Sequence, residues 1–86
     1  MHYVYVLQSE KEKAKIYVGN TGELDRRLAQ HNYGKVYATK QYRPYRIVYY
    51  EAYLDRHDAL DRELKLKHHG SVIGHLKRRI KRSLAH

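Results

Sequence analysis

Residues 2–8 read His-Tyr-Val-Tyr-Val-Leu-Gln, and residues 15–20 read Lys-Ile-Tyr-Val-Gly-Asn. Both segments are rich in the β-branched and aromatic residues that favour strands. Only the short polar stretch 9–14 separates them, so they predict an antiparallel hairpin. A turn centred near Lys11 would place Tyr5 directly opposite Tyr17, with both phenols on one face of the sheet. Gly19 would share that face and leave room for a close approach to the backbone.

The hairpin is followed by a helical pattern that ends at about Asn32. Thr21 offers an N-cap for this helix, and Leu24 and Leu28 would form its buried face. Asn32 and Gly34 are residues that commonly stop a helix. The connection from the hairpin is short, so the helix is expected to fold back beside the two strands.

The second half of the chain predicts a third strand and two further helices. Residues 35–45 form an irregular basic loop, and residues 46–53 have strand composition. Asp55 would cap a helix whose apolar stripe is Ala59, Leu60 and Leu64. Gly70 would end that helix and Ser71 would cap the last one. The last helix carries apolar residues on one side, expected to pack on the domain: Ile73, Leu76, Ile80 and Leu84.

The predicted fold is of the α+β class, with a small three-stranded antiparallel sheet flanked by helices in the order β-β-α-β-α-α. The 86 residues are expected to form a single domain over residues 1–86. There is no cysteine, which excludes disulfides and thiolate metal sites and fits a cytoplasmic location. No apolar stretch is long enough to predict a membrane span.

The charge is the strongest global feature of the composition. Eighteen Lys and Arg against nine Asp and Glu give a net charge of +9, which points to a polyanionic partner such as nucleic acid. Residues 64–86 contain seven Lys or Arg and no acid. All ten aromatic residues are tyrosines, so every aromatic ring carries a hydroxyl.

Two side chains of the first helix are candidates for phosphate chemistry. Arg27 and His31 are four residues apart, so they project from one helix face and could converge on Tyr5 and Tyr17. Arginine binds phosphate with two parallel hydrogen bonds, and histidine exchanges protons near neutral pH.

Glu63 is the candidate acidic residue on the second helix. It lies four residues after Ala59, at the edge of the apolar stripe, so its carboxylate should be partly buried and face the sheet. One carboxylate with waters and a substrate phosphate is a usual Mg²⁺ arrangement. The alternative is a surface glutamate paired with Lys67 at i+4.

Several short motifs follow one another along the chain. They are Tyr3-Val4-Tyr5, Tyr17-Val18-Gly19, Asn20-Thr21-Gly22-Glu23-Leu24-Asp25-Arg26-Arg27-Leu28, His31-Asn32, Ala38-Thr39-Lys40, residues 43–51, and Ala59-Leu60-Asp61-Arg62-Glu63-Leu64-Lys65-Leu66-Lys67. This ordered set resembles the GIY-YIG nuclease superfamily, and in particular its small stand-alone members, over residues 2–67. Two positions depart from the family pattern: Tyr3 stands where the family has Gly, and Asn20 where relatives often have an aromatic residue.

The resemblance implies an endonuclease that hydrolyses DNA phosphodiester bonds with one Mg²⁺ or Mn²⁺ ion. It implies that Glu63 holds the metal, that Arg27 contacts the scissile phosphate, and that Tyr17 is the base or orients the water, with Tyr5 and His31 assisting. A free phenol has a pKa of about 10, so a base role requires a cation nearby. These five residues are expected to line one concave, solvent-reachable surface.

Basic residues are expected to supply affinity for DNA. The candidates are Lys40, Arg43, Lys67, Lys77, Arg78 and Arg79. Tyr37 is an alternative to Lys40 as the loop residue that reaches the substrate. The main rival interpretation is a non-catalytic nucleic-acid-binding module of the same fold. A second rival, in which the tail binds an anionic membrane, explains the apolar side of the tail less well than packing does.

Overall fold

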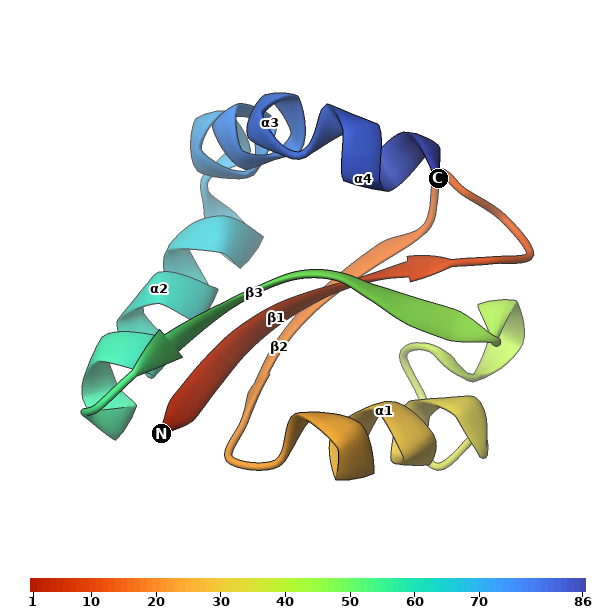
Figure 1. Ribbon diagram of the computed structural model, residues 1–86, viewed down its shortest axis with the longest axis horizontal. Helices are drawn as coiled ribbons and strands as arrows, with labels where there is room; N and C mark the ends of the chain where they lie inside the picture. The colour runs from red at the N-terminus through yellow and green to blue at the C-terminus, as the bar shows by residue number, and fades with distance from the viewer.

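A computed structural model describes all residues, 1–86, and shows a three-stranded antiparallel sheet in the order β2-β1-β3 (Figure 1). The strands are β1 (His2–Ser9), β2 (Ile16–Thr21) and β3 (Tyr45–Tyr53). The helices are α1 (Leu24–Asn32), the 3₁₀ turn η1 (Lys40–Tyr42), α2 (Arg56–His68), α3 (Gly70–Arg79) and α4 (Lys81–Ala85). The predicted fold class and element order are confirmed, except that the last predicted helix is interrupted at Ile80.

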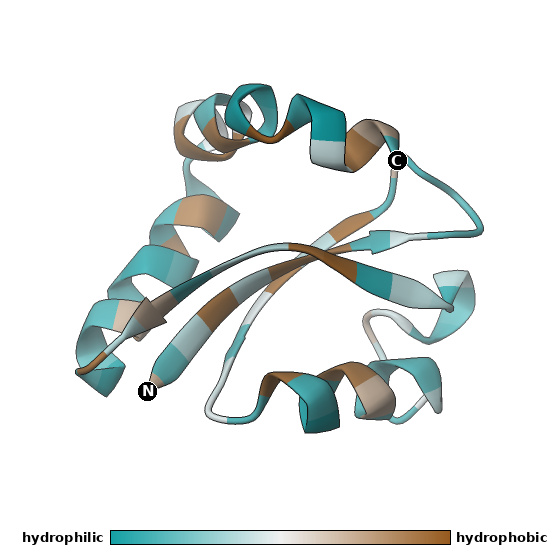
Figure 2. Ribbon diagram, in the orientation of Figure 1, coloured by the Kyte–Doolittle hydropathy of each residue, from teal (hydrophilic) through white to brown (hydrophobic).

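Strand β1 lies in the middle of the sheet and is covered on both faces. Its residues 4–9 are all buried, which explains why this strand reads as an almost unbroken apolar run. On one face of the sheet, Val4, Val6 and Val18 pack against α2 and α3. On the other face, Tyr5 and Leu7 pack against α1. Figure 2 shows hydrophobic residues along the middle of the strands, and helices around them that carry both hydrophobic and hydrophilic stretches.

The predicted register of the hairpin is wrong by two residues. Tyr5 lies opposite Gly19, and Tyr17 lies opposite Leu7. The side chain of Ser9 sets this longer turn, because its hydroxyl accepts hydrogen bonds from the amides of Lys11 (3.1 Å) and Glu12 (2.9 Å). A slip of two residues keeps each side chain on its own face, so both tyrosines still face α1.

Two of the three predicted helix caps differ from expectation. The Thr21 hydroxyl accepts a hydrogen bond from the backbone amide of Glu23 in a turn before α1. Helix α1 therefore has no side-chain N-cap. Ser71 lies inside α3, which begins at Gly70. Asp55 does cap α2, by accepting from the amide of His57 at 2.7 Å.

The buried stripe of α2 is formed by Ala59, Glu63 and Leu66. Leu64, expected in that stripe, is 52% exposed. The spacing 59, 63, 66 follows one helix face, and the sequence places a glutamate in the middle of it. A carboxylate therefore occupies a position that the helix directs at the protein interior.

The C-terminal helices pack on the sheet as predicted. Leu76 is buried, and Ile73 and Ile80 are partly buried against the same core cluster. Polar contacts add to this packing, since the side chains of Gln8 and Arg46 donate to the carbonyls of Leu84 (3.0 Å) and Ser83 (3.1 Å). No helix in the structure is both long and apolar enough to span a membrane.

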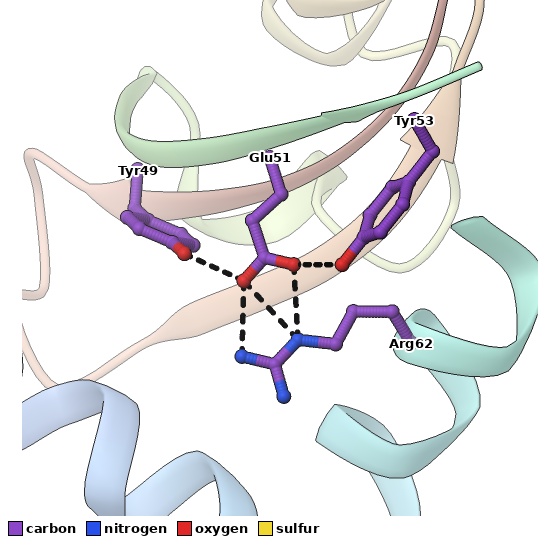
Figure 3. A network of polar contacts seen from close by, with 4 residues as sticks. All are labelled: Tyr49, Glu51, Tyr53 and Arg62. Atoms are coloured by element: carbon purple, nitrogen blue, oxygen red, sulfur yellow. Dashed lines mark hydrogen bonds and ion pairs between the residues drawn. The ribbon is translucent and has the colours of Figure 1, made fainter. Parts of the chain in front are cut away.

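A polar network joins α2 to β3 (Figure 3). The guanidinium of Arg62 contacts both carboxylate oxygens of Glu51, at distances from 2.9 to 3.1 Å. The hydroxyls of Tyr49 and Tyr53 donate to the same carboxylate. Burial alone would raise the pKa of Glu51, but these hydrogen bonds outweigh burial and hold it below its ordinary value.

Candidate active site

Gly19 is the point at which the two tyrosines of the hairpin come together. A Cβ atom at Gly19 would lie 2.5 Å from the Tyr5 hydroxyl oxygen and 3.0 Å from Cε2 of Tyr17. The space left by this glycine is therefore filled by the Tyr5 ring itself, which crosses the backbone of β2. The rings of Tyr5 and Tyr17 lie 6.4 Å apart between centroids.

Helix α1 brings Arg27 and His31 to the Tyr5 hydroxyl, as their spacing predicted. Nε2 of His31 lies 2.9 Å from the Tyr5 hydroxyl oxygen, and Nε of Arg27 donates to that oxygen at 3.4 Å. The ring of Tyr17 packs edge-on against His31, 5.0 Å between centroids. Asn32 then anchors the end of α1 to β3 by pairing with both backbone groups of Tyr45.

His31 is fully buried and neutral at neutral pH. Burial, with a smaller contribution from the Arg27 charge, lowers its pKa from 6.5 to about 4. Burial also raises the pKa of Tyr5, although the hydrogen bond from Arg27 opposes that change. The Tyr5–His31 pair is therefore a contact between two uncharged groups at pH 7.

The hydrogen-bond chain through His31 has one direction that satisfies all of its members. Arg27 donates to the Tyr5 oxygen, which leaves the Tyr5 O–H to donate to Nε2 of His31. Nδ1 then carries the ring proton and donates to the hydroxyl of Thr39 at 2.7 Å. The Thr39 hydroxyl donates to the carbonyl of Val36 at 3.4 Å. Thr39, which is fully buried, thus sets the tautomer of His31.

Glu63 lies on the other face of the sheet from Tyr5 and Tyr17, and its contact with Asn20 joins it to the edge strand β2. Its side chain is buried, and its two oxygens contact the amide of Asn20 and, at 2.9 Å, the ammonium of Lys67. That ammonium lies 5.3 Å from the centroid of the Tyr17 ring. The Glu63 charge also helps to raise the pKa of Tyr5, so the carboxylate is within electrostatic reach of the tyrosine site. Glu63 is thus buried, as its place beside the apolar stripe predicted, and it makes the i+4 pair with Lys67 of the alternative interpretation, but not on the surface.

Two hollows open along the β2 edge of the molecule. One is lined by polar residues that include Asn20, Arg26 and Arg27. The other includes Tyr17, Lys67 and Lys77. Tyr5, His31 and Glu63 line neither hollow, because they are 2%, 0% and 8% exposed.

The expectation that all five site residues line one solvent-reachable surface is therefore wrong: Tyr5, His31 and Glu63 are buried, and Arg27 and Tyr17 line different hollows. Arg27 and Tyr17 each line one of the two hollows, and the buried Tyr5 and His31 contact them from the protein interior. In a core this small, buried side chains such as Tyr5 and His31 fix the orientation of the more exposed side chains that they contact.

The basic residues expected to bind DNA are divided among different surfaces. Lys67 and Lys77 lie beside Tyr17. Lys40 and Arg43 line a separate hollow in the loop before β3. Arg79 lies with Arg62 and His75 between α2 and α3, and Arg78 contacts His75.

Comparison of the sequence with protein families identifies the family of this chain. The family model described as the GIY-YIG catalytic domain matches residues 1–72. This range includes Glu63 and every residue of the hydrogen-bond network from Tyr5 to Thr39. The chain belongs to the GIY-YIG family. This GIY-YIG protein is therefore a member of a nuclease family, and its substrate class is expected to be nucleic acid.

The relatives that match it carry the name UPF0213 protein. One from Lacticaseibacillus paracasei is 40% identical over 68 residues, covering 78% of this chain and 74% of the relative. Those from Staphylococcus haemolyticus and Haloquadratum walsbyi are 36% and 34% identical over 67 residues, covering 77% of this chain and 79% and 73% of the relatives. No solved structure gives a significant match.

The donor set around Glu63 suits Mg²⁺ or Mn²⁺ bound mainly by water and substrate. No group of three or more His, Cys, Asp or Glu side chains is placed to hold a metal by itself. A single carboxylate, one oxygen of which pairs with the Lys67 ammonium, is compatible with a magnesium ion whose other ligands are waters and phosphate oxygens. Zinc, which prefers three or four nitrogen or sulfur ligands, does not fit these residues.

Sequence reasoning missed two residues of the site. Asn20 was noted only as a departure from the family pattern, yet its amide holds Glu63. It pairs with Val4 in the hairpin and so lies on the face of the sheet that α2 covers, which the alternation of strand residues alone already implied. Nothing in the loop sequence indicated that Thr39 contacts His31.

Proposed function

We propose that this GIY-YIG protein is an endonuclease that hydrolyses DNA phosphodiester bonds with one bound Mg²⁺ or Mn²⁺. The observation that supports the proposal is that a guanidinium, a phenol and a buried carboxylate are linked through shared neighbours. Tyr5 lies between Arg27 and Tyr17, and Lys67 lies between Tyr17 and Glu63. The three groups come from three elements: Arg27 from α1, Tyr17 from β2 and Glu63 from α2. A protein that only binds nucleic acid has no need for a buried carboxylate beside its phosphate site, because that charge repels phosphate.

Each group has a role that follows from its position. Arg27 is half-buried with its Nε on the Tyr5 hydroxyl, which orients the guanidinium toward the hollow that it lines and therefore toward a phosphate. Tyr17 lies beside the ammonium of Lys67 and is reachable from the second hollow, where it would orient and deprotonate the attacking water.

Glu63 would hold the divalent ion, which when bound would stabilise the negative charge that develops on the phosphate. Asn20 fixes one carboxylate oxygen, while Lys67 balances its charge in the absence of a metal ion. Tyr5 and His31 act as positioning residues, since they are buried and hold Arg27 and Tyr17 in place.

A cleavage assay on plasmid and branched DNA, with Mg²⁺, Mn²⁺ or EDTA, tests the proposal. Glu63→Gln should abolish metal-dependent cleavage while binding to DNA in EDTA survives, because basic residues elsewhere supply affinity. Tyr17→Phe should preserve folding and lose turnover. Arg27→Ala should lower the rate by about 10²–10³-fold, the usual effect of removing a group aimed at developing charge.

Matched controls are available on the surface. Glu10→Gln removes an exposed carboxylate and Tyr50→Phe removes the hydroxyl of an exposed tyrosine, so neither should alter cleavage. DNA binding by the wild-type protein without cleavage under any metal condition would instead support the non-catalytic binding module. Cleavage that persists in Glu63→Gln would refute the metal role of Glu63.

A further inference from the structure

The loop between α1 and β3 contains a hollow that the proposed chemistry does not use. Its volume is about 490 Å³, within the roughly 300–1,000 Å³ typical of ligand pockets. We call it the Tyr37 pocket, and it is lined by Tyr37, Ala38, Lys40, Gln41, Tyr42 and Arg43.

Tyr37 gives this pocket an aromatic surface with almost no protein contact. Its side chain is 95% exposed, although it is flanked by Val36, which is partly buried. Packing in the core therefore does not explain why an aromatic residue stands at position 37. The second ring of the pocket, Tyr42, is half-buried and packs against the core cluster of Tyr5 and Leu7.

The charged residues that line the pocket are all positive. Lys40 and Arg43 line the pocket, none of its lining residues is acidic, and the ammonium of Lys15 lies 5.0 Å from the centroid of the Tyr42 ring. Arg43 is held against the loop, since it donates to the carbonyl of Lys40 at 3.1 Å. An occupant that suits flat rings and cations together is a nucleotide, whose base stacks while its phosphate meets the charges.

The pocket is tied directly to the candidate active site. Thr39 lies between two residues of the pocket, and it is fully buried with its hydroxyl on Nδ1 of His31. Two hydrogen bonds and one imidazole ring therefore separate the loop from the Tyr5 hydroxyl. A nucleotide in the pocket would be held at a fixed position relative to the phosphate at Arg27.

We propose that the Tyr37 pocket binds one unpaired nucleobase of the substrate strand, stacked on Tyr37, with its phosphates on Lys40 and Arg43. This inference rests on the proposed function for the identity of the polymer. A base inside a duplex has both faces covered by its neighbours, so the pocket selects substrates with an unpaired segment near the scissile phosphate.

The test is a binding titration in EDTA, where no cleavage occurs, with the full chain and three fluorescent probes. The probes are a single-stranded oligonucleotide, the same oligonucleotide with every base removed to leave the sugar-phosphate backbone, and its duplex. Tyr37→Ala should weaken single-strand binding by about 5- to 150-fold, as expected for the loss of one stacked base, and leave backbone-only binding unchanged. Tyr37→Trp should retain the wild-type affinity.

Tyr33→Ala is the matched control, because Tyr33 is 78% exposed and lines no part of the pocket. The proposal is overturned if Tyr37→Ala binds the single strand as tightly as Tyr33→Ala does, or weakens backbone-only binding equally. It is also overturned if Tyr37→Ala changes the oligomeric state, which would make the pocket a protein interface. Because the titration needs neither metal nor cleavage, a negative result in the cleavage assay leaves this test informative.

Discussion

The close contact between Gly19 and the Tyr5 ring matters both for the stability of the fold and for the geometry of the candidate active site. The missing side chain of Gly19 lets the Tyr5 ring lie across β2, and that position puts the Tyr5 hydroxyl on His31 and Arg27. Tyr5 is 2% exposed, so it has no free space into which it could withdraw.

We therefore predict that Gly19→Ala both destabilises the protein and displaces the Tyr5 hydroxyl. The added methyl would lie 2.6 Å from Cζ of Tyr5, and overpacking of this kind typically costs about 1–3 kcal/mol. Urea unfolding measures the loss of stability, and the cleavage assay measures the effect on the site. Gly22→Ala is the control, since a methyl there meets no atom within 4 Å. Equal stability of the two variants would show that Tyr5 can move freely.

At the scale of elements, the Glu51–Arg62 pair and its two tyrosines fix α2 against β3. The lowered pKa of Glu51 means that the folded state favours the carboxylate over the acid. Its stabilising effect is complete above the ordinary pKa of 4.5 and is lost as the pH falls through the lower folded-state value.

Glu51→Gln should accordingly lower stability by about 2 kcal/mol at pH 7, since hydrogen bonds to a charged group are replaced by neutral ones. The difference between variant and wild type should shrink as the pH falls below about 4.5, because the unfolded wild-type chain then binds a proton at Glu51 that the folded carboxylate, with its lower pKa, does not yet bind. Urea midpoints measured between pH 3 and pH 7 provide the comparison, with Glu10→Gln as the exposed control. A constant difference over that range would contradict the assigned role of the network.

The elements themselves could be predicted from the sequence, whereas several of their contacts could not. Alternation fixes which face a strand residue occupies, so Tyr5 and Tyr17 were correctly placed on one face. Alternation does not fix which residues of β1 and β2 lie opposite each other, and this register depends here on the Ser9 hydroxyl in the turn. Likewise, helical spacing identified Glu63 as partly buried, but its contact with Asn20 depends on how α2 crosses β2.

For the molecule as a whole, the positive charge is distributed over more than one surface. Lys77 lies with Lys67 beside Tyr17, while Arg79 lies between α2 and α3 with Arg62 and His75. DNA that reaches the candidate active site should thus contact the first surface and not the second.

We predict an affinity for nonspecific DNA on the order of 10⁻⁴–10⁻⁶ M at physiological salt, falling steeply as salt rises. Lys77→Gln should reduce the slope of log affinity against log salt by about 1, the effect of one lost phosphate contact. Arg79→Gln should leave the slope unchanged. Titrations at several salt concentrations give the slopes, and equal slopes for the two variants would contradict this division of the surface.

The order of the site residues along the chain also has a consequence for biosynthesis. Tyr5, Tyr17, Arg27 and His31 all belong to the first three elements, whereas Glu63 arrives only with α2. Because a ribosome makes the N-terminal part first, the nascent protein contains its arginine and tyrosines before its carboxylate exists. The proposed nuclease would thus be synthesised in an inert form and would gain its metal ligand only when α2 docks against β2.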